Sequence, residues 1–324
     1  MHNFYYPLCK VSGVKVSIIV ATYSSAMFEH FKECIKSLLR QTYEDIEIIV
    51  IVDGDKEYYK QILTKLATLI NTGTIRVYLN EKNVGLAESR NRGVELANGD
   101  VVAFIDDDAV ADERWIEELV KMYEQGAIAA GGKLVPLWIA KKPKWLPEEF
   151  YWLIGATHLG FPEKVTEVRN TFGSNISFQK ETFVNAGGFR SELGVRGRAQ
   201  IQAEEADLCE RMRIKFGKGV IYNPKAIVYH KIFDRRTKLS FLINRAFWQG
   251  YSKAVMSNDF RRIGEETDFL KYLVLKRTGT RLRAVLNGSY IDLTKLILLW
   301  VFMFIVGVGY FYGRALRQKS YLSS

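Results

Sequence analysis

Three consecutive aspartates, Asp106, Asp107 and Asp108, are candidates for chemistry because they directly follow an apolar stretch at residues 101–105. Carboxylates this close together repel one another unless a cation lies among them. Their hard oxygen ligands favour Mg²⁺ or Mn²⁺, ions that commonly bridge a carboxylate and substrate phosphates. Side chains alternate along an extended chain, so Asp106 and Asp108 are expected to point the same way. A solvated acidic turn whose last aspartate caps a helix is the alternative interpretation.

A glycine turn followed by a helix carries the next candidates, in the segment NVGLAESRNRG at residues 83–93. Gly85 opens the expected helix over 86–97, and Arg90 and Arg92 fall in its first turns. Helix N-termini and guanidinium groups both attract phosphate oxygens, so the segment predicts a diphosphate site. An ordinary capped helix with exposed arginines would have the same pattern.

Acidic residues begin a third segment, where Glu204, Glu205 and Asp207 open a helix predicted over 204–216. Carboxylates at this end of a helix are stabilised by its dipole, which is sufficient reason for their presence. The functional interpretation is a general base that takes a proton from an acceptor hydroxyl.

The elements that position these residues alternate between strands and helices. Uninterrupted apolar runs predict strands buried on both faces over 16–21, 47–52 and 101–105. Further strands are expected over 76–79 and 175–178, with short strands near Val220 and Ile227. The alternation predicts an α/β fold with a mostly parallel sheet. Ligands of such sheets bind beyond the carboxyl ends of the strands, where Thr22, Tyr23, Asp53 and the three aspartates fall.

In this order the segments resemble glycosyltransferase family 2, whose catalytic domain has the GT-A fold. The resemblance covers residues 16–230 and is strongest in NVGLAESRNRGVELANGDVVAFIDDDA. VSIIVATYSSA resembles the family's opening strand, and VDGD at 52–55 its turn around the nucleotide base. The resemblance implies a nucleotide-sugar donor, and it implies donor-binding roles for a set of residues at the strand ends: Thr22, Tyr23, Asp53, Gly85, Arg90, Asp106 and Asp107.

The resemblance also implies a Mn²⁺ or Mg²⁺ ion, with Asp108, Asp106 and His230 as its ligands; a purely structural histidine is the alternative at position 230. The family commonly has Glu-Asp where this chain has Glu204-Glu205, so the catalytic base falls on Glu205, and Glu204 is the second candidate. The implied reaction is an inverting displacement, which needs one base and no covalent intermediate.

The chain becomes basic beyond the expected catalytic domain at 14–232. Of its net charge of +10, a large part lies between 231 and 283, where 13 Lys/Arg face 5 Asp/Glu. Residues 233–290 are interpreted as a basic, helical, membrane-surface segment with an amphipathic helix over 238–255. Residues 293–312, LTKLILLWVFMFIVGVGYFY, match the thickness of a bilayer and predict one transmembrane helix. A basic segment next to a membrane anchor favours a membrane surface over nucleic acid as the partner.

The three cysteines, Cys9, Cys34 and Cys209, are far apart and form no CxxC pair, which fits a reducing compartment. The first residues have no basic stretch followed by an apolar run, so they do not read as a secretory signal. Together these features predict a single-pass protein of the cell membrane whose catalytic domain lies on the cytoplasmic side.

A catalytic domain held at a membrane indicates a lipid-linked acceptor. EEADLCERM and VYHKIFDRRTK are similar to segments of archaeal transferases that extend dolichyl-phosphate-linked glycans. That resemblance implies glycan assembly or protein N-glycosylation, a UDP-sugar donor, and UDP-glucuronate as the specific candidate. Two alternatives stay open: a membrane protein that binds nucleotide sugars without turnover, and a polysaccharide synthase, a class that generally has several membrane helices.

Overall fold

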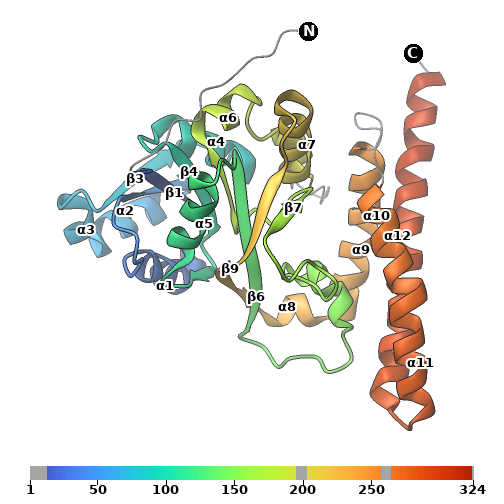
Figure 1. Cartoon of the computed structure of the whole chain (residues 1–324). Coiled ribbons are helices and arrows are strands. Elements are labelled where there is room, and N and C mark those ends of the chain that lie inside the picture. The colour runs from blue at the N-terminus through green and yellow to red at the C-terminus, as the bar shows by residue number, and fades with distance from the viewer. Residues whose placement is uncertain (1–12, 195–202, 257–263, 323–324) are drawn as a thin grey trace.

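The computed structural model describes residues 13–194, 203–256 and 264–322; Cys9 lies outside this part of the chain. A nine-stranded sheet forms its centre, with strands in the order β3-β2-β1-β4-β8-β6-β9-β5 and β7 paired to β9 (Figure 1). The strands have these bounds: β1 Val16–Thr22, β2 Ile46–Asp53, β3 Ile75–Asn80, β4 Val101–Asp106, β5 Ala109–Ala111, β6 Ala129–Trp138, β7 Thr166–Val168, β8 Ile176–Gln179 and β9 Val220–Ile232.

The first half of the sheet is parallel, as the apolar runs predict. β1 pairs in parallel with both β2 and β4, and β2 with β3. Alternate residues of β1 enter two different cores, since Ile18 faces one and Ile19 the other. Helices α1 (Phe28–Leu38), α2 (Lys56–Lys65) and α5 (Trp115–Glu124) cover the first face, and α4 (Leu86–Leu96), α6 (Lys180–Asn185) and α7 (Glu204–Phe216) cover the second. Burial on both faces is the reason why the central positions of β1, β2 and β4 are almost all apolar.

The second half of the sheet is mixed. β8 runs antiparallel to its neighbours β4 and β6, and β9 runs parallel to β6. The prediction of two short strands near Val220 and Ile227 is wrong, because one strand of 13 residues, β9, spans both. Its register with β6 shifts between Gly132 and Lys133, which leaves Pro224 in a bulge. A proline without an N–H is tolerated at such a bulge, and this interruption gave the sequence the appearance of two strands.

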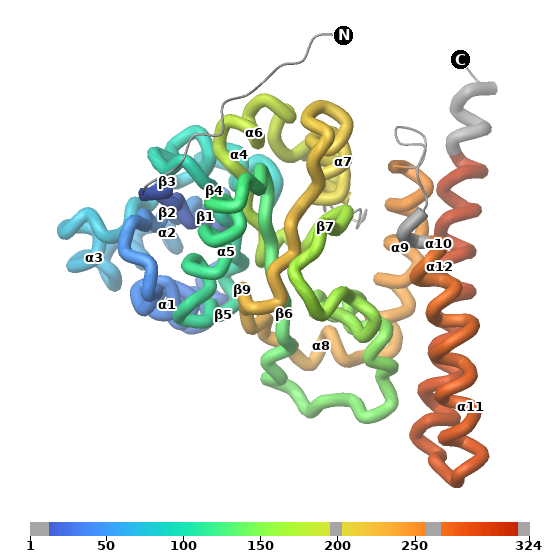
Figure 2. Tube along the Cα trace, viewed as in Figure 1, coloured from blue at the N-terminus to red at the C-terminus, as the bar shows by residue number. Residues whose placement is uncertain are grey.

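The last quarter of the described chain is helical, and α9 to α12 form a layer beside the sheet and its covering helices (Figures 1 and 2). It consists of α8 Asp234–Thr237, α9 Leu239–Met256, α10 Gly264–Lys271, η4 Tyr272–Arg277, α11 Thr278–Leu286 and α12 Tyr290–Leu322. Buried side chains of α9 (Leu242, Ala246) and α12 (Leu299, Phe302) form one cluster with Phe150 of the short helix η2, Glu148–Ile154. Part of the apolar face of α9, expected to rest on a bilayer, therefore packs inside the protein, while Leu239 and Ile243 of the same face are exposed.

Ion pairs fix the start of α12 to the catalytic domain. Arg281 lies 2.8 Å from Glu148, 2.9 Å from the fully buried Glu149 and 2.6 Å from Asp292 of α12. Lys295 of α12 adds a contact of 2.6 Å to Glu148. Removing one partner of a buried pair is costly because it leaves an uncompensated charge, so this network holds α12 and η2 in a fixed relation.

Among the described residues, α12 is the one helix long and apolar enough to cross a membrane, over Tyr290–Leu316. Large apolar side chains recur on its outer surface at intervals of seven residues: Tyr290, Ile297, Phe304 and Phe311 are all exposed. The opposite surface meets α9 through small residues. A side chain at Gly309 would collide with the Phe247 carbonyl oxygen, and one at Gly250 with the Val306 carbonyl oxygen. Small residues allow helix backbones to approach this closely.

Two glycines of α12 provide a matched test of this contact. We expect Gly309→Ala to lower stability by about 1–3 kcal/mol, because the added methyl overpacks the interface with α9. Gly307→Ala should be neutral or stabilising by up to about 1 kcal/mol, since no atom lies within 4 Å of its added carbon and alanine favours helix. Thermal unfolding in detergent measures both. Equal melting temperatures for the two variants would contradict the close contact.

Candidate active site

Side chains from several strand ends meet in one cavity of about 1210 Å³. Asp106 ends β4 at the carboxyl edge of the parallel half of the sheet. His230 lies near the end of β9, opposite Ala109 of β5, and this antiparallel pairing brings it beside the aspartates. Glu204 and Glu205 enter the same cavity from the first turn of α7.

Asp106, Asp108 and His230 form a cluster able to hold a divalent cation. One ligand atom from each lies within 4.8 Å of the others. The His230 ring is buried, and its Nε2 lies 3.4 Å from the Asp108 carboxylate. Neither ring nitrogen has a hydrogen-bond partner among the described residues, and such a pair of buried orphan atoms fits a role as ligand. Two carboxylates and an imidazole suit Mn²⁺ and also accommodate Mg²⁺.

Asp108 is also held by a cation that the sequence did not single out. The Arg236 guanidinium lies 3.7 Å from its carboxylate. Although burial opposes ionisation, His230 and Arg236 together keep the pKa of Asp108 below its ordinary value. Gly155, with a φ of +78°, lets the end of η2 approach this group, since a side chain there would press on His230. Arg236 belongs to a basic run that composition alone assigned to the membrane.

Asp107 points away from this cluster, as alternation along the chain predicts. Its carboxylate accepts a hydrogen bond of 2.6 Å from the Thr22 hydroxyl at the end of β1. Burial raises the pKa of Asp107 to about 7 despite that bond. Thr22 and Asp107, which were both predicted to bind the nucleotide-sugar donor, thus contact each other. Tyr23, the residue after Thr22, is 63% exposed.

Asp53 organises the loop before α4. Its carboxylate accepts hydrogen bonds from the backbone N–H groups of Val84 and Gly85, at 3.0 and 2.8 Å, and from the Asn80 side chain at 3.0 Å. Gly85 has a φ of +93°, which favours glycine at the turn into the helix. The buried Asn80 received no role from the sequence, although it makes Asp53 part of a connected polar group.

Arg90 links the aspartates to the acidic pair of α7. Its guanidinium is almost fully buried and lies 2.8 Å from Asp106 and 3.0 Å from Glu205. Gly173 makes room for this bridge, because a side chain there would collide with the Glu205 carboxylate. Ser174 accepts the Asp106 backbone N–H at 3.1 Å. The predicted diphosphate-binding arginine is therefore engaged by carboxylates in this structure.

The two glutamates have different surroundings. Glu205 is oriented by Arg90, whereas Glu204 is buried, with one oxygen lacking a hydrogen-bond partner among the described residues. Burial and the charge of Glu205 raise the pKa of Glu204 to about 8, so Glu204 carries a proton at neutral pH. Asp207, the remaining acid of this turn, lies 2.7 Å from Arg211 and 3.4 Å from Arg190 and faces those cations.

Comparison with known proteins identifies the family. The model described as glycosyl transferase family 2 matches residues 17–185. Glucosyl-dolichyl phosphate glucuronosyltransferase of Haloferax volcanii is 43% identical over 304 residues, which cover 93% of this chain and 96% of that protein. The chain is a family 2 glycosyltransferase. The resemblance carried by its motifs is thereby confirmed.

Solved structures place this family 2 glycosyltransferase in the GT-A fold. The mannosyltransferase PcManGT from Pyrobaculum calidifontis, solved with GDP-Man and Mn²⁺, has a TM-score of 0.62 at 15% identity, over 94% of this chain and 88% of that one. GalNAc-T7, solved with UDP, GalNAc and Mn²⁺, has a TM-score of 0.55 at 17% identity, over 80% and 54%. The predicted fold class is confirmed.

Asp108 and Asp107 differ by one position and give a matched test of the cation cluster. We expect Asp108→Asn to weaken Mn²⁺ binding roughly tenfold or more, because loss of groups that merely orient a ligand already costs 10–100-fold. Asp107→Asn should bind Mn²⁺ like the wild type, since its side chain faces Thr22. Electron paramagnetic resonance of free Mn²⁺, with and without UDP, measures both. The cluster is misassigned if the two variants lose the ion equally.

Proposed function

We propose that this glycosyltransferase moves a sugar, with inversion, from a nucleoside-diphosphate donor to a lipid-linked acceptor. The observation that carries the proposal is the Arg90 bridge, which holds Glu205 next to Asp106 at the wall of a cavity that also reaches α12. A base, a diphosphate site and an apolar helix then face one space. The name of the Haloferax volcanii relative supports UDP-glucuronate as donor and glucosyl-dolichyl phosphate as acceptor, in glycan assembly or protein N-glycosylation.

In this proposal Glu205 takes the proton from the acceptor hydroxyl. The hydroxyl oxygen forms its bond to the anomeric carbon while the bond from that carbon to the diphosphate oxygen breaks on the opposite face. Arg90 keeps the Glu205 carboxylate in place, whereas burial and the charge of Glu205 raise the pKa of Glu204 and favour its protonated form, which accepts no proton. A Mn²⁺ or Mg²⁺ ion held by Asp106, Asp108 and His230 would stabilise the negative charge of the departing diphosphate.

The donor-binding roles follow from the same arrangement. Thr22, Tyr23 and Asp53 lie at the ends of β1 and β2, on the side proposed for the nucleoside. Gly85 and Arg90 lie at the start of α4 and are proposed to face the diphosphate together with Asp106, whereas Asp107, bonded to Thr22, is proposed to face the nucleoside. Binding at this edge requires Arg90 to share its donors between carboxylates and phosphate, which a guanidinium with five N–H groups can do.

Two other functions make different predictions. A protein that binds nucleotide sugars without turnover would show no release of UDP or GDP from any sugar nucleotide. A polysaccharide synthase would elongate its product without release. Enzymes of that class generally have several membrane helices, whereas the described residues contain one candidate. A screen of UDP- and GDP-sugars for donor hydrolysis separates the first case, and product length separates the second.

The acidic pair allows a test of the base in which only one residue should matter. We expect Glu205→Gln to keep donor affinity and to lower the transfer rate by roughly 10²–10⁴-fold, the share of rate that general-base catalysis contributes. Glu204→Gln should have a small effect, because a carboxamide resembles the protonated acid that Glu204 is at neutral pH. Donor binding and transfer rates are measured for both. An inactive Glu204→Gln beside a nearly normal Glu205→Gln would reverse the assignment.

We further propose that α12 crosses the membrane once and that the catalytic domain is cytoplasmic. Support comes from the length and apolar surface of α12 and from the two buried cysteines, Cys34 and Cys209, which are unpaired. Cysteines introduced at the exposed Thr72 and at Ser324, with Cys9 replaced, should react with an impermeant maleimide from opposite sides of membrane vesicles. If both react from one side, α12 lies along the membrane surface.

A further inference from the structure

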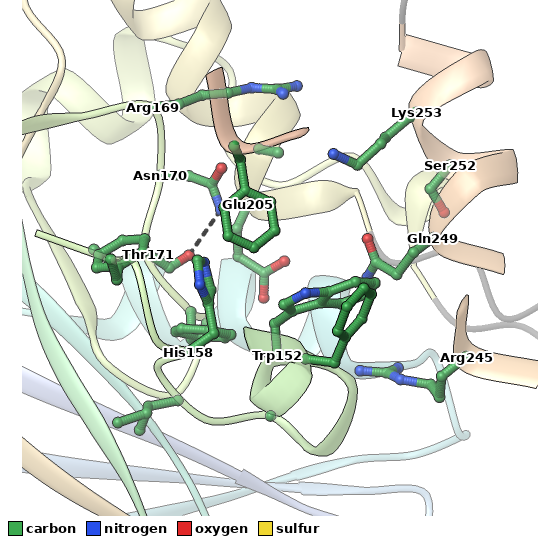
Figure 3. A pocket seen from close by; sticks show the side chains of 18 of the residues that line it. Trp152, His158, Arg169, Asn170, Thr171, Glu205, Arg245, Gln249, Ser252 and Lys253 are labelled. Carbon is green, nitrogen blue, oxygen red and sulfur yellow. Dashed lines mark hydrogen bonds between the residues drawn. The ribbon is translucent and has the colours of Figure 1, made fainter. Parts of the chain in front are cut away.

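The cavity continues past Glu205 to a region that the proposed reaction leaves unexplained. Its far wall is formed by α9, from which Arg245, Gln249, Ser252 and Lys253 enter the space (Figure 3). These positions lie on one side of α9, whereas Phe247, Gly250 and Ala254 meet α12 on the opposite side. α9 thus separates a polar face toward the cavity from an apolar face toward α12.

Arg245 is a half-buried cation that is attracted by Glu204 and Glu205 but forms an ion pair with neither. It makes no hydrogen bond or ion pair with any residue in the described ranges, and its buried Nε is left without an acceptor. Burial and the nearby Arg236 lower the pKa of Arg245 to about 10, so its surroundings disfavour the charge. A partly buried guanidinium without a hydrogen-bonded anion keeps a charge that its surroundings do not fully compensate. Its planar donor fork matches a phosphate group.

The walls around Arg245 indicate what kind of molecule carries that phosphate. Met303, Val306 and Tyr310 of α12 line the cavity, and Phe269 and Leu273 line it from α10 and η4. These are apolar or aromatic side chains, and Asp106 and Glu205 line the same cavity. A ligand that fits the carboxylate, the guanidinium and the apolar wall of this cavity has a hydroxyl at Glu205, a phosphate at Arg245 and a hydrocarbon chain along α12.

We propose that Arg245 binds the phosphate of the lipid-linked acceptor and that α12 contacts the first part of its chain. This inference rests on the proposed function, since it places the acceptor in the same cavity. The diphosphate of the donor is proposed to bind elsewhere, beside the possible metal ligands Asp106, Asp108 and His230. Arg236 also lies there. Arg245 is a substrate-binding residue that takes no part in proton transfer.

The test uses the full chain in detergent and phytanyl phosphate as probe, with binding followed by tryptophan fluorescence because Trp152 lines the cavity. Arg245→Gln should bind phytanyl phosphate roughly 10- to 100-fold more weakly than the wild type, the range expected for charge-assisted hydrogen bonds. Lys238→Gln is the matched control: it removes the same charge from the same segment, but Lys238 is exposed and pairs with Asp234. It should bind like the wild type, and phytanol should bind both proteins equally weakly.

The other outcomes overturn the inference in recognisable ways. Unchanged binding of phytanyl phosphate by Arg245→Gln removes Arg245 from the site. Weaker UDP binding by the same variant assigns the guanidinium to the donor, and equally tight binding of inorganic phosphate to the wild type removes the lipid chain from the site. Arg245→Lys, which keeps the charge but not the planar fork, should show an intermediate affinity and controls for folding.

Turnover tests the proposed function separately. A wild-type protein that binds phytanyl phosphate through Arg245 but transfers no sugar to glycosyl-phytanyl phosphates contradicts the proposed function and leaves the phosphate site in place. If Arg245→Gln transfers sugar to such an acceptor with the wild-type KM, the reaction does not use this phosphate site. That result overturns the inference about Arg245 and leaves the proposed function in place.

Discussion

The arrangement of the site depends on one buried guanidinium. Arg90 comes from α4, yet it neutralises Asp106 at the end of β4 and Glu205 at the start of α7. Two carboxylates from distant parts of the chain lie close together only because a cation lies between them. Gly173 is required beside them for the same reason, since the bridge fills the space that a side chain would need. The positions of Asp106 and Glu205 and the close approach of the backbone at Gly173 thus depend on a single charge.

Charge is distributed unevenly around the cavity, and this asymmetry explains how two negatively charged substrates share it. The end near the sheet has its carboxylates paired with Arg90, His230 and Arg236. The end near α9 presents an unpaired Arg245. In the proposed reaction different groups attract the phosphates of the donor and of the acceptor, so the two substrates need not compete for the same cation. Between the two ends, the carboxylate of Glu205 is oriented toward the space where their reacting atoms meet.

Sequence patterns predicted the features that depend on residues close together in the chain or on a family motif. β1, β2 and β4 were expected as buried runs, and the Asp106, Asp108 and His230 cluster agrees with alternation and motif. The different states of Glu204 and Glu205 were not predictable, because they arise from tertiary burial and from Arg90. Likewise, the periodicity of α9 shows which face is apolar but not what covers it. α12 packs against α9 at Gly250 and Gly309, and the need for glycine there is visible only when both helix backbones are in place. Asp53 was identified by position, whereas its bonds to the next loop depend on the folded sheet.

The packing of α12 has a mechanical consequence. The same helix presents aromatic side chains outward and forms part of the cavity wall with Met303 and Val306, and its contact with α9 runs backbone against backbone at Gly309. Such a contact has no soft side chains to absorb movement, and the ion pairs of Arg281 anchor one end. If α12 spans a bilayer as proposed, a change in bilayer thickness or lateral pressure that tilts it must move that wall or strain the glycine contact. The lipid composition around the protein becomes a variable of the active-site shape.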